Sequence, residues 1–459
     1  MGIDEGFDMV PRLTRGGEDV LKWKDFIDAI REQYQDDTQV VFHDNYIEFL
    51  AGVHPMLPLE GHKFLRFSSK TTGRIASETH VLDYLQSVCR IARSAFGLRI
   101  RQWTEAGDQF GFYDCRDGNA TTTTPRLMVG RSGSDADYPL RYGNDKLYEA
   151  LEIPGKGKGL VARCNIGSGT RILCEAPFLV FPSISPEELH KNVAARLTTL
   201  SKEKQRQFLS LHNNFRGRYA FAGILRTNAL PCGPGSSTGG IYLEICRINH
   251  SCLPNCHNSW NTETQHETIH AIRDILAGEE ITISYEQGDP TPARHEHLRT
   301  NFGFNCQCEL CSLPHEELQA SDRRRRQIQR LDEQIGNGLT MMTEPLVSLQ
   351  ACQALLKTLI DEYHSRDMAL IPRLYYDAFQ VAITHGDESR AKVFAERAYK
   401  ARVACEGEDS PETKRVKGFM QNPSSHVAFA QGSKMWKTSK TAQPRNLSVD
   451  EFEKWLWRH

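Results

Sequence analysis

The stretch RINHSCLPN, residues 247–255, places two asparagines and one histidine close to Cys252. Asparagine and serine side chains often hydrogen-bond their own backbone in turns, so the stretch alone is compatible with an ordinary turn. Its surroundings indicate more than a turn. Cysteine is a common metal ligand, and further along the chain a strand-like run, EEITISY at residues 279–285, ends in Tyr285. We therefore treat residues 247–255 as a candidate functional segment.

Residues 306–311, CQCELC, indicate a metal site because they bring three thiols into one short segment. Zinc in structural sites takes four tetrahedral ligands, so this segment needs one ligand from elsewhere. Cys252 and Cys256 are the nearest cysteines and His257 is a weaker candidate, and spacing does not choose among them. The 13 cysteines are an odd number, which fits reduced thiols that bind metal better than a set of disulfides.

A glycine-rich segment, GKGKGL at residues 155–160, precedes these motifs. It lacks the Gly-Lys-Ser/Thr ending of a phosphate-binding loop and the spacing of a dinucleotide fingerprint, so by itself it is weak evidence for a ligand. Glycines do let the backbone approach a ligand closely.

Taken in this order, the segments resemble the SET-domain protein methyltransferases. Residues 156–160 look like the opening cofactor loop, and residues 247–255 match the family's Asn-His-Ser-Cys-x-Pro-Asn motif. Residues 279–285 resemble its Glu-Glu-Ile-x-x-x-Tyr strand, and residues 305–311 resemble its zinc-binding post-SET segment.

The SET and MYND subgroup and its fungal relatives are the most similar part of that family. Three features support this: the lead-in Thr227-Asn228, the Cys-x-Cys-x-x-Cys spacing, and a helical C-terminal region, which is tetratricopeptide-like in that subgroup. One feature departs from it. No MYND finger, with its own paired cysteines and histidine, interrupts the sequence, so partner recognition of that kind is not implied.

The resemblance implies S-adenosyl-L-methionine as methyl donor and a lysine side chain of a protein, histone or non-histone, as acceptor. The implied cofactor-binding residues are Lys156, Gly157, Lys158, Gly159, Asn228, Asn249 and His250. In the family the cysteine of the Asn-His-Ser-Cys motif is the fourth zinc ligand. The implied zinc ligands are therefore Cys252, Cys306, Cys308 and Cys311. The family also threads its last strand through the loop that holds residues 249–255, a pseudoknot that would bring Tyr285 beside the cofactor.

Tyr285 is the implied catalytic residue, and Phe302 and Phe304 the implied walls of the substrate channel. Methyl transfer from a sulfonium needs a neutral amine held in a fixed approach, so positioning supplies most of the acceleration. Phe302 stands where relatives usually carry tyrosine. This favours an alternative, a weak or inactive zinc-scaffolded interaction protein, whereas the intact Asn249, His250 and Tyr285 favour the enzyme.

The 459 residues predict several domains of α+β class. In chain order we expect an α/β accessory domain at 1–115, a linker at 116–145, a β-rich SET domain at 146–290 with a helical insert at about 186–211, a post-SET zinc segment at 291–312, and a helical domain at 313–459. The linker is rich in Gly, Asp, Thr, Ser and Arg.

Apolar spacing predicts helices in the first and last of these domains. Val20, Leu21, Phe26, Ile27 and Ile30 indicate one helix, and a longer one is expected from about residue 78. Short strands are expected at 39–42, 46–50, 63–67 and 98–103. In the C-terminal region we expect helices at 346–363, at 370–384 and after Gly386-Asp387. Thr343 is the expected N-cap of the helix at 346–363.

The formal net charge of −2 provides no global basic field, so we expect no direct nucleic-acid binding. The run Arg323–Arg326 with Arg330 is expected to be a solvated helix face. The N-terminus is acidic without a following apolar core, and no apolar stretch approaches the roughly 20 residues that span a bilayer. We expect an intracellular protein of the nucleus and/or cytoplasm, without membrane contact, whose partners are lysine-bearing proteins, with histones or chromatin among the candidates.

Overall fold

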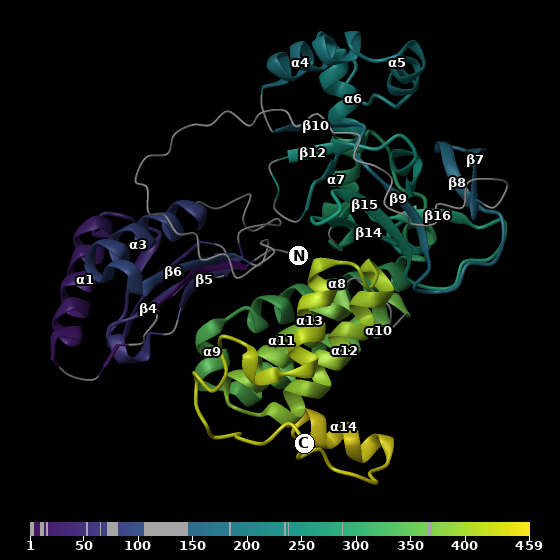
Figure 1. The fold of residues 1–459 in the computed structure, drawn as a ribbon. Helices are drawn as coiled ribbons and strands as arrows, with labels where there is room; N and C mark the ends of the chain where they lie inside the picture. Colours follow the sequence, from purple (N-terminus) through teal and green to yellow (C-terminus); the bar gives the residue numbers. More distant parts are fainter. Residues whose placement is uncertain are drawn as a thin grey trace.

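Figure 1 shows a computed structural model of the chain, with an N-terminal α/β part, a central β-rich part and a C-terminal helical part. It describes residues 4–9, 13–14, 17–51, 54–64, 66–70, 81–104, 146–182, 185–233, 236, 238–286, 288–364 and 370–459. The predicted linker at 116–145 lies outside the described residues. In the described ranges, no helix is both long enough and apolar enough to cross a membrane.

Within its described residues, the N-terminal part contains two antiparallel sheets and the helices α1 and α3. One sheet has the order β5-β1-β6 and the other β2-β3-β4. The elements are β1 (Asp4–Met9), α1 (Glu18–Tyr34), β2 (Val40–Phe42), β3 (Tyr46–Phe49), β4 (Met56–Pro58), β5 (Arg66–Lys70), α3 (Val81–Phe96) and β6 (Ile100–Thr104). Aromatic side chains fill its core, with Trp23, Phe26 and Phe96 in mutual contact.

The sequence located most of these elements, with two corrections. Val20 and Leu21 are 50% and 65% exposed, because α1 turns Trp23, Phe26, Ile27 and Ile30 inward instead. The strand expected at 63–67 begins at Arg66, and Gly61–Lys63 form a 3-10 turn.

In the part of residues 146–290 that the structure describes, the strands form small sheets with the orders β13-β16-β8-β7, β14-β15-β9 and β10-β12-β11. Its strands are β7 (Tyr148–Ile153), β8 (Gly157–Ala162), β9 (Arg171–Glu175), β10 (Leu179–Pro182), β11 (Leu230–Pro231), β12 (Thr238–Ile241), β13 (Asn249–His250), β14 (Cys256–Asn261), β15 (His266–Ala271) and β16 (Glu280–Ile283). The β13–β16 pair is parallel and places Asn249 opposite Thr282 and His250 opposite Ile283. The pair therefore joins the segment 247–255 to the segment 279–285.

The helical insert is longer than the sequence predicted. Residues 186–211 form α4 (Pro186–Thr198) and α5 (Lys202–Leu209), and a third helix, α6 (Ala220–Asn228), follows. The oxygens of Ser185 and Ser201 accept hydrogen bonds from the backbone at the starts of α4 and α5, which fixes those two ends. The sequence did not predict α6, which follows Tyr219 without a side-chain cap.

After β16 the chain forms α7 (Thr291–Phe302), which ends where Gly303 adopts a φ of 72°. This left-handed conformation suits glycine and turns the chain back toward the cysteine segment.

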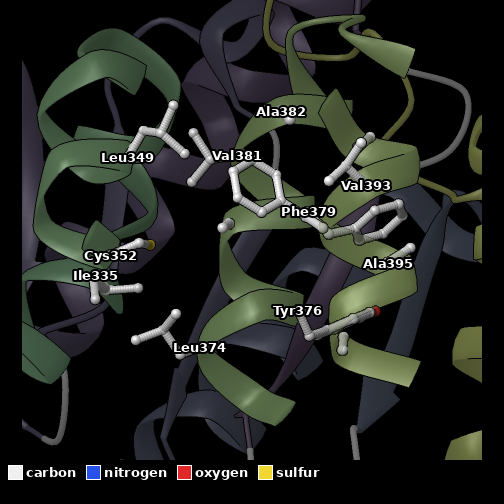
Figure 2. Close-up of a cluster of buried hydrophobic side chains, with 14 of the residues drawn as sticks. Ile335, Leu349, Cys352, Leu374, Tyr376, Phe379, Val381, Ala382, Val393 and Ala395 are labelled. Atoms are coloured by element: carbon white, nitrogen blue, oxygen red, sulfur yellow. The ribbon is translucent and has the colours of Figure 1, made fainter. Parts of the chain in front are cut away.

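The C-terminal part is helical: α8 (His315–Ile335), α9 (Gly338–Thr343), α10 (Pro345–Tyr363), α11 (Leu370–Thr384), α12 (Glu388–Glu406), α13 (Pro411–Gln421) and α14 (Val449–Trp457). Figure 2 shows Leu349 of α10, Phe379 of α11 and Ala395 of α12 in its core, all fully buried. The small residues Ala391, Ala395 and Ala398 let α12 pack closely on α11.

Two sequence predictions fail in this part. Thr343 is not the N-cap of α10. It is the last residue of α9, and its hydroxyl donates to the carbonyl of Leu339 at 3.0 Å. The arginine run is not a uniformly solvated face, because Arg325 is fully buried.

The helical part packs on the central part through α12, which contacts β14 and β15. Polar contacts fix this junction. Arg171 of β9 forms an ion pair with Asp409, and the Asn261 amide donates to the Asp409 carbonyl at 3.2 Å.

Candidate active site

The four implied zinc ligands, Cys252, Cys306, Cys308 and Cys311, have their sulfur atoms within 4.8 Å of one another. Cys252 Sγ lies 3.8 Å from Cys306 Sγ and 3.6 Å from Cys311 Sγ. Zinc–sulfur bonds of about 2.3 Å in a tetrahedron separate the sulfurs by about 3.8 Å. The donor set and its spacing therefore fit one zinc ion.

Polar groups surround the thiol cluster. His295 Nε2 lies 3.3 Å and Arg294 Nη2 3.6 Å from Cys311 Sγ. Hydrogen bonding, first of all from Cys252, lowers the pKa of the Cys311 thiol. Four thiolates around Zn²⁺ leave a net negative charge, which the buried Arg294 guanidinium offsets.

The other candidate zinc ligands lie apart from the cluster. Cys256 and His257 sit in β14, opposite Ala271 and His270 of β15. Burial raises the pKa of the Cys256 thiol, so Cys256 is a neutral core residue.

The glycine-rich segment forms the turn between β7 and β8 and is tied to Asn249. The Asn249 amide donates to the Lys158 carbonyl at 3.3 Å and to Glu280 Oε1 at 2.8 Å. The other oxygen of Glu280 accepts from Lys156 Nζ at 2.6 Å. Glu280 therefore fixes the loop and Asn249 together, a role that the sequence did not assign, although its Glu-Glu motif could have drawn attention to it.

Gly157 and Gly159 are glycines for different reasons. Gly157 has a φ of 73° and open space where a Cβ would stand, so its backbone conformation requires glycine and its surface stays accessible. A Cβ on Gly159 would lie 2.7 Å from Asn249 Nδ2 and 2.6 Å from the Ile153 side chain. Gly159 is therefore a packing requirement that lets Asn249 reach the loop.

His250 links Tyr285 to the thiol cluster. Its Nδ1 accepts a hydrogen bond from the Tyr285 amide at 3.0 Å, and its Nε2 lies 3.1 Å from Cys252 Sγ. Burial lowers the pKa of His250 to about 4, so the ring is neutral at physiological pH. The imidazole therefore holds Tyr285, just after β16, in a fixed position relative to the thiol cluster.

Tyr285 carries a neutral, oriented phenol. Its hydroxyl donates to the Ile248 carbonyl at 2.5 Å, which leaves the oxygen free to accept further hydrogen bonds. Burial raises its pKa, which keeps the phenol protonated.

Aromatic rings surround this phenol. The Phe302 ring lies 4.7 Å from the Tyr285 ring, and Phe304 lies 6.0 Å from His250, both between centroids. These residues pack against the thiol cluster. The structure thus brings the two implied channel residues to the implied catalytic tyrosine.

Asn255, the last residue of the 247–255 stretch, holds β16 in place. It is 1% exposed, and its amide donates to the Glu280 carbonyl at 2.8 Å while its oxygen accepts from the Thr282 amide at 2.8 Å. β16 therefore lies against the loop 249–255 on one side and β8 on the other. This places the end of β16 beside the loop 249–255.

Arg325 of α8 reaches the site from the helical part, which the sequence did not predict. Its Nη2 donates to the carbonyl of Cys252 at 3.1 Å, and its Nε donates to Glu362 Oε1 at 2.7 Å. Its Nη1 lies 3.5 Å from Glu286, the residue after Tyr285. All three side chains are almost completely buried. A run of four arginines resembles a solvated face, so no sequence signal singled Arg325 out.

Asn228 lies at the end of α6, and its side-chain amide donates to the carbonyls of His212 and Ile224, both at 2.7 Å. Within the described residues no hydrogen bond joins Asn228 to Asn249 or His250. The structure therefore brings together every implied site residue except Asn228.

Comparisons with known proteins agree with this geometry. Residues 157–286 match the model of the SET domain. Histone-lysine N-methyltransferase set5 of Schizosaccharomyces pombe is 33% identical over 290 residues, which cover 62% of this chain and 87% of that protein. Histone-lysine N-methyltransferase SMYD3 of Homo sapiens is 40% identical over 73 residues, a match that covers 16% of this chain and 17% of that protein. The solved structure of Rubisco LSMT bound to AdoMet has 12% identity and a TM-score of 0.27, with 68% of this chain and 95% of that chain covered.

The fold and the site thus define a SET-domain protein. With the match over most of the S. pombe protein, the chain belongs to the SET-domain family of protein-lysine methyltransferases, in which fungal Set5 and animal SMYD enzymes are among its relatives.

Proposed function

We propose that this chain transfers a methyl group from S-adenosyl-L-methionine to a lysine side chain of a protein substrate. The observation that carries the proposal is the parallel β13–β16 pair. It joins Asn249, which binds the glycine loop, to the strand that leads to Tyr285. The contact between His250 Nε2 and Cys252 Sγ connects the strand pair to the thiol cluster.

Lys156, Gly157, Lys158, Gly159, Asn249 and His250 are the residues that we propose hold the cofactor, with Asn228 as a further contact. When bound, S-adenosyl-L-methionine supplies a methyl group on a positively charged sulfonium. The accessible backbone of Gly157 suits such a ligand, since it permits close approach. His250 contributes through its backbone and by placing Tyr285.

Tyr285 is the residue that we propose orients the substrate amine. Its hydroxyl hydrogen is committed to Ile248, so its oxygen can accept a hydrogen bond from the lysine N–H. A neutral phenol holds the amine without competing for its lone pair, which must attack the methyl carbon. Phe302 and Phe304 exclude water and favour the neutral amine over the ammonium form.

Zinc bound by Cys252, Cys306, Cys308 and Cys311 would be structural, because four protein ligands leave no open position. It would connect the loop 249–255 to the segment that carries Phe302 and Phe304.

The S. pombe and human relatives are named as histone-lysine methyltransferases, so we propose histones as the first substrates to test and the nucleus, with the cytoplasm, as the site of action. We further propose that the SET domain spans residues 146–290 and the post-SET segment 291–312. The helical residues 313–459, tetratricopeptide-like in this reading, would flank the channel.

Two measurements test this function. Calorimetric titration with S-adenosyl-L-methionine should show one site per chain. Incubation of the protein with labelled cofactor should then transfer labelled methyl groups to core histones or to proteins of a mixed lysate. A zinc-scaffolded protein without activity, the alternative suggested by Phe302, would bind cofactor or not but would transfer no label to any protein. Absence of transfer to both substrate sets would reject the proposed function.

A further inference from the structure

A cavity of about 760 Å³ lies in the helical insert, between the helices α4 and α6 and the sheet β10-β12-β11. Its volume falls within the range of about 300–1,000 Å³ typical of ligand pockets. None of the implied catalytic, cofactor-binding or zinc-binding residues lines it. Figure 1 shows α4 and α6 at the opposite end of the molecule from α14.

The interior of this cavity is apolar. Phe181 of β10, Leu189 of α4 and Phe215 contribute to its walls, together with Ala222 of α6. The mouth is open, because Pro182, Gly217 and Pro231 line the cavity and are themselves exposed. An open apolar cavity suits a side chain that projects from a longer segment, whose flanks then remain at the surface.

Arginines surround the opening. Arg218 and Arg226 line the cavity, and Arg216 is close in sequence. The Arg226 guanidinium lies 4.0 Å from the centroid of the Phe215 ring, and that of Arg218 lies 5.4 Å from the centroid of the Tyr219 ring. In the described part of the chain no carboxylate forms an ion pair with any of these three arginines.

Glu187 does not neutralise these arginines. Glu187 of α4 forms an ion pair with Lys191 at 2.7 Å and accepts a hydrogen bond from the Tyr219 hydroxyl at 3.2 Å. The rim of the cavity is therefore positively charged, and a basic substrate segment, such as one rich in lysine, would be repelled.

We propose that this cavity, with Arg218 and Arg226, docks an acidic segment of a partner protein through a bulky apolar side chain. The apolar walls take the anchor, and the arginines, which are weakly hydrated and suited to bidentate pairing, take carboxylates on either side of it. The site is separate from methyl transfer. It would recruit a partner without occupying the lysine channel.

The test uses the full chain and a pool of fluorescein-labelled peptides in which Phe, Leu, Trp or Met stand at the centre between Asp and Glu residues. We expect saturable binding by fluorescence anisotropy that weakens with added salt. Replacing the central residues by Ser, or the acidic flanks by Lys, should weaken binding by roughly tenfold or more. No binding of the acidic pool would overturn the proposal.

Variants locate the binding. Arg218→Glu together with Arg226→Glu should weaken binding by roughly tenfold or more. Gly217→Trp should also weaken it, because a side chain on Gly217 enters open space at the cavity without a clash. Zinc content and histone methylation should match the parent in both variants, which shows that they are folded.

The matched control reverses two arginines elsewhere, Arg323→Glu together with Arg330→Glu, both exposed on α8. This variant should bind the peptides as the parent does. If it loses binding while the cavity variants retain it, the acidic segment docks on α8 and the proposal is wrong.

Discussion

Tyr285 holds its hydroxyl on the Ile248 carbonyl, so the phenol is oriented before substrate arrives. Tyr285→Phe removes the oxygen that would accept from the lysine amine but keeps the ring. We expect turnover to fall by roughly 10²-fold or more, the scale for losing one preorganised polar group at a reacting centre. Calorimetry should show unchanged cofactor affinity. Parent turnover in this variant would make Tyr285 a core residue.

Phe302→Tyr tests whether the side chain at this position determines how many methyl groups are added to a lysine. Its ring lies 4.7 Å from that of Tyr285, so a hydroxyl added by Phe302→Tyr would enter the space next to the oriented phenol. We expect the number of methyl groups per lysine or the turnover to change, because the new group can hold the amine. Mass spectrometry of the modified peptide reads both. Identical products and rates would show that Phe302 does not face the reacting amine.

Cys252 and Cys256 form a matched pair for the metal, since both are 1% exposed and only Cys252 lies in the thiol cluster. Cys252→Ser removes one of four thiolates and should release zinc, whereas Cys256→Ser should keep it. Metal analysis of the purified variants measures this. Full zinc in the Cys252 variant together with loss in the Cys256 variant would reverse the assignment.

Glu267 gives a prediction for pH. It is 1% exposed, its Oε2 has no hydrogen-bond partner among the described residues, and burial raises its pKa to about 8. The folded state then holds a proton that the unfolded state loses near pH 4.5, so this group's contribution falls as pH rises from about 4.5 to 8. Glu267→Gln should raise the melting temperature more at pH 8 than at pH 5. An equal change at both pH values would show that Glu267 is ionised in the fold.

At the scale of elements, α8 is part of the site because Arg325 binds the Cys252 carbonyl, Glu362 and Glu286. Removing one partner of a buried ion pair leaves an uncompensated charge and costs about 3–5 kcal/mol. Arg325→Ala should therefore lower stability by about that amount in chemical denaturation.

Arg323→Ala is the control for Arg325, since Arg323 belongs to the same run but is exposed. It should change stability by no more than about 0.5 kcal/mol. Equal effects of the two variants would mean that the buried network contributes nothing specific.

Sequence patterns located some of the helices and strands and missed others. Periodicity located helices such as α11 and α12 because one face of each is apolar, and it located strands such as β3. It missed α6, β12 and β14, whose residues lack a clear alternation or a cap. Thr343 was misjudged as an N-cap because α9 ends there, a boundary set by packing between helices and not by the local sequence.

In the whole molecule, the residues of the motifs could be predicted from the sequence, whereas the distant residues that hold them in place could not. The family resemblance implied Asn249, Tyr285 and the four cysteines as one site, and the structure brings these together. Spacing alone had left Cys252, Cys256 and His257 open as the fourth ligand. Arg325 and Glu362 come from helices distant in sequence, so only the packing of the helical part on the central part reveals them. No local pattern distinguishes a buried arginine from its exposed neighbours.

Mass spectrometry of a proteome incubated with labelled S-adenosyl-L-methionine and either the parent or Tyr285→Phe tests whether this chain methylates protein lysines through Tyr285. We expect labelled methyllysine on a defined set of proteins with the parent, and at least about 10²-fold less with the variant at equal cofactor affinity. Cofactor binding by the parent without labelled methyllysine on any protein would show that the chain is not a lysine methyltransferase.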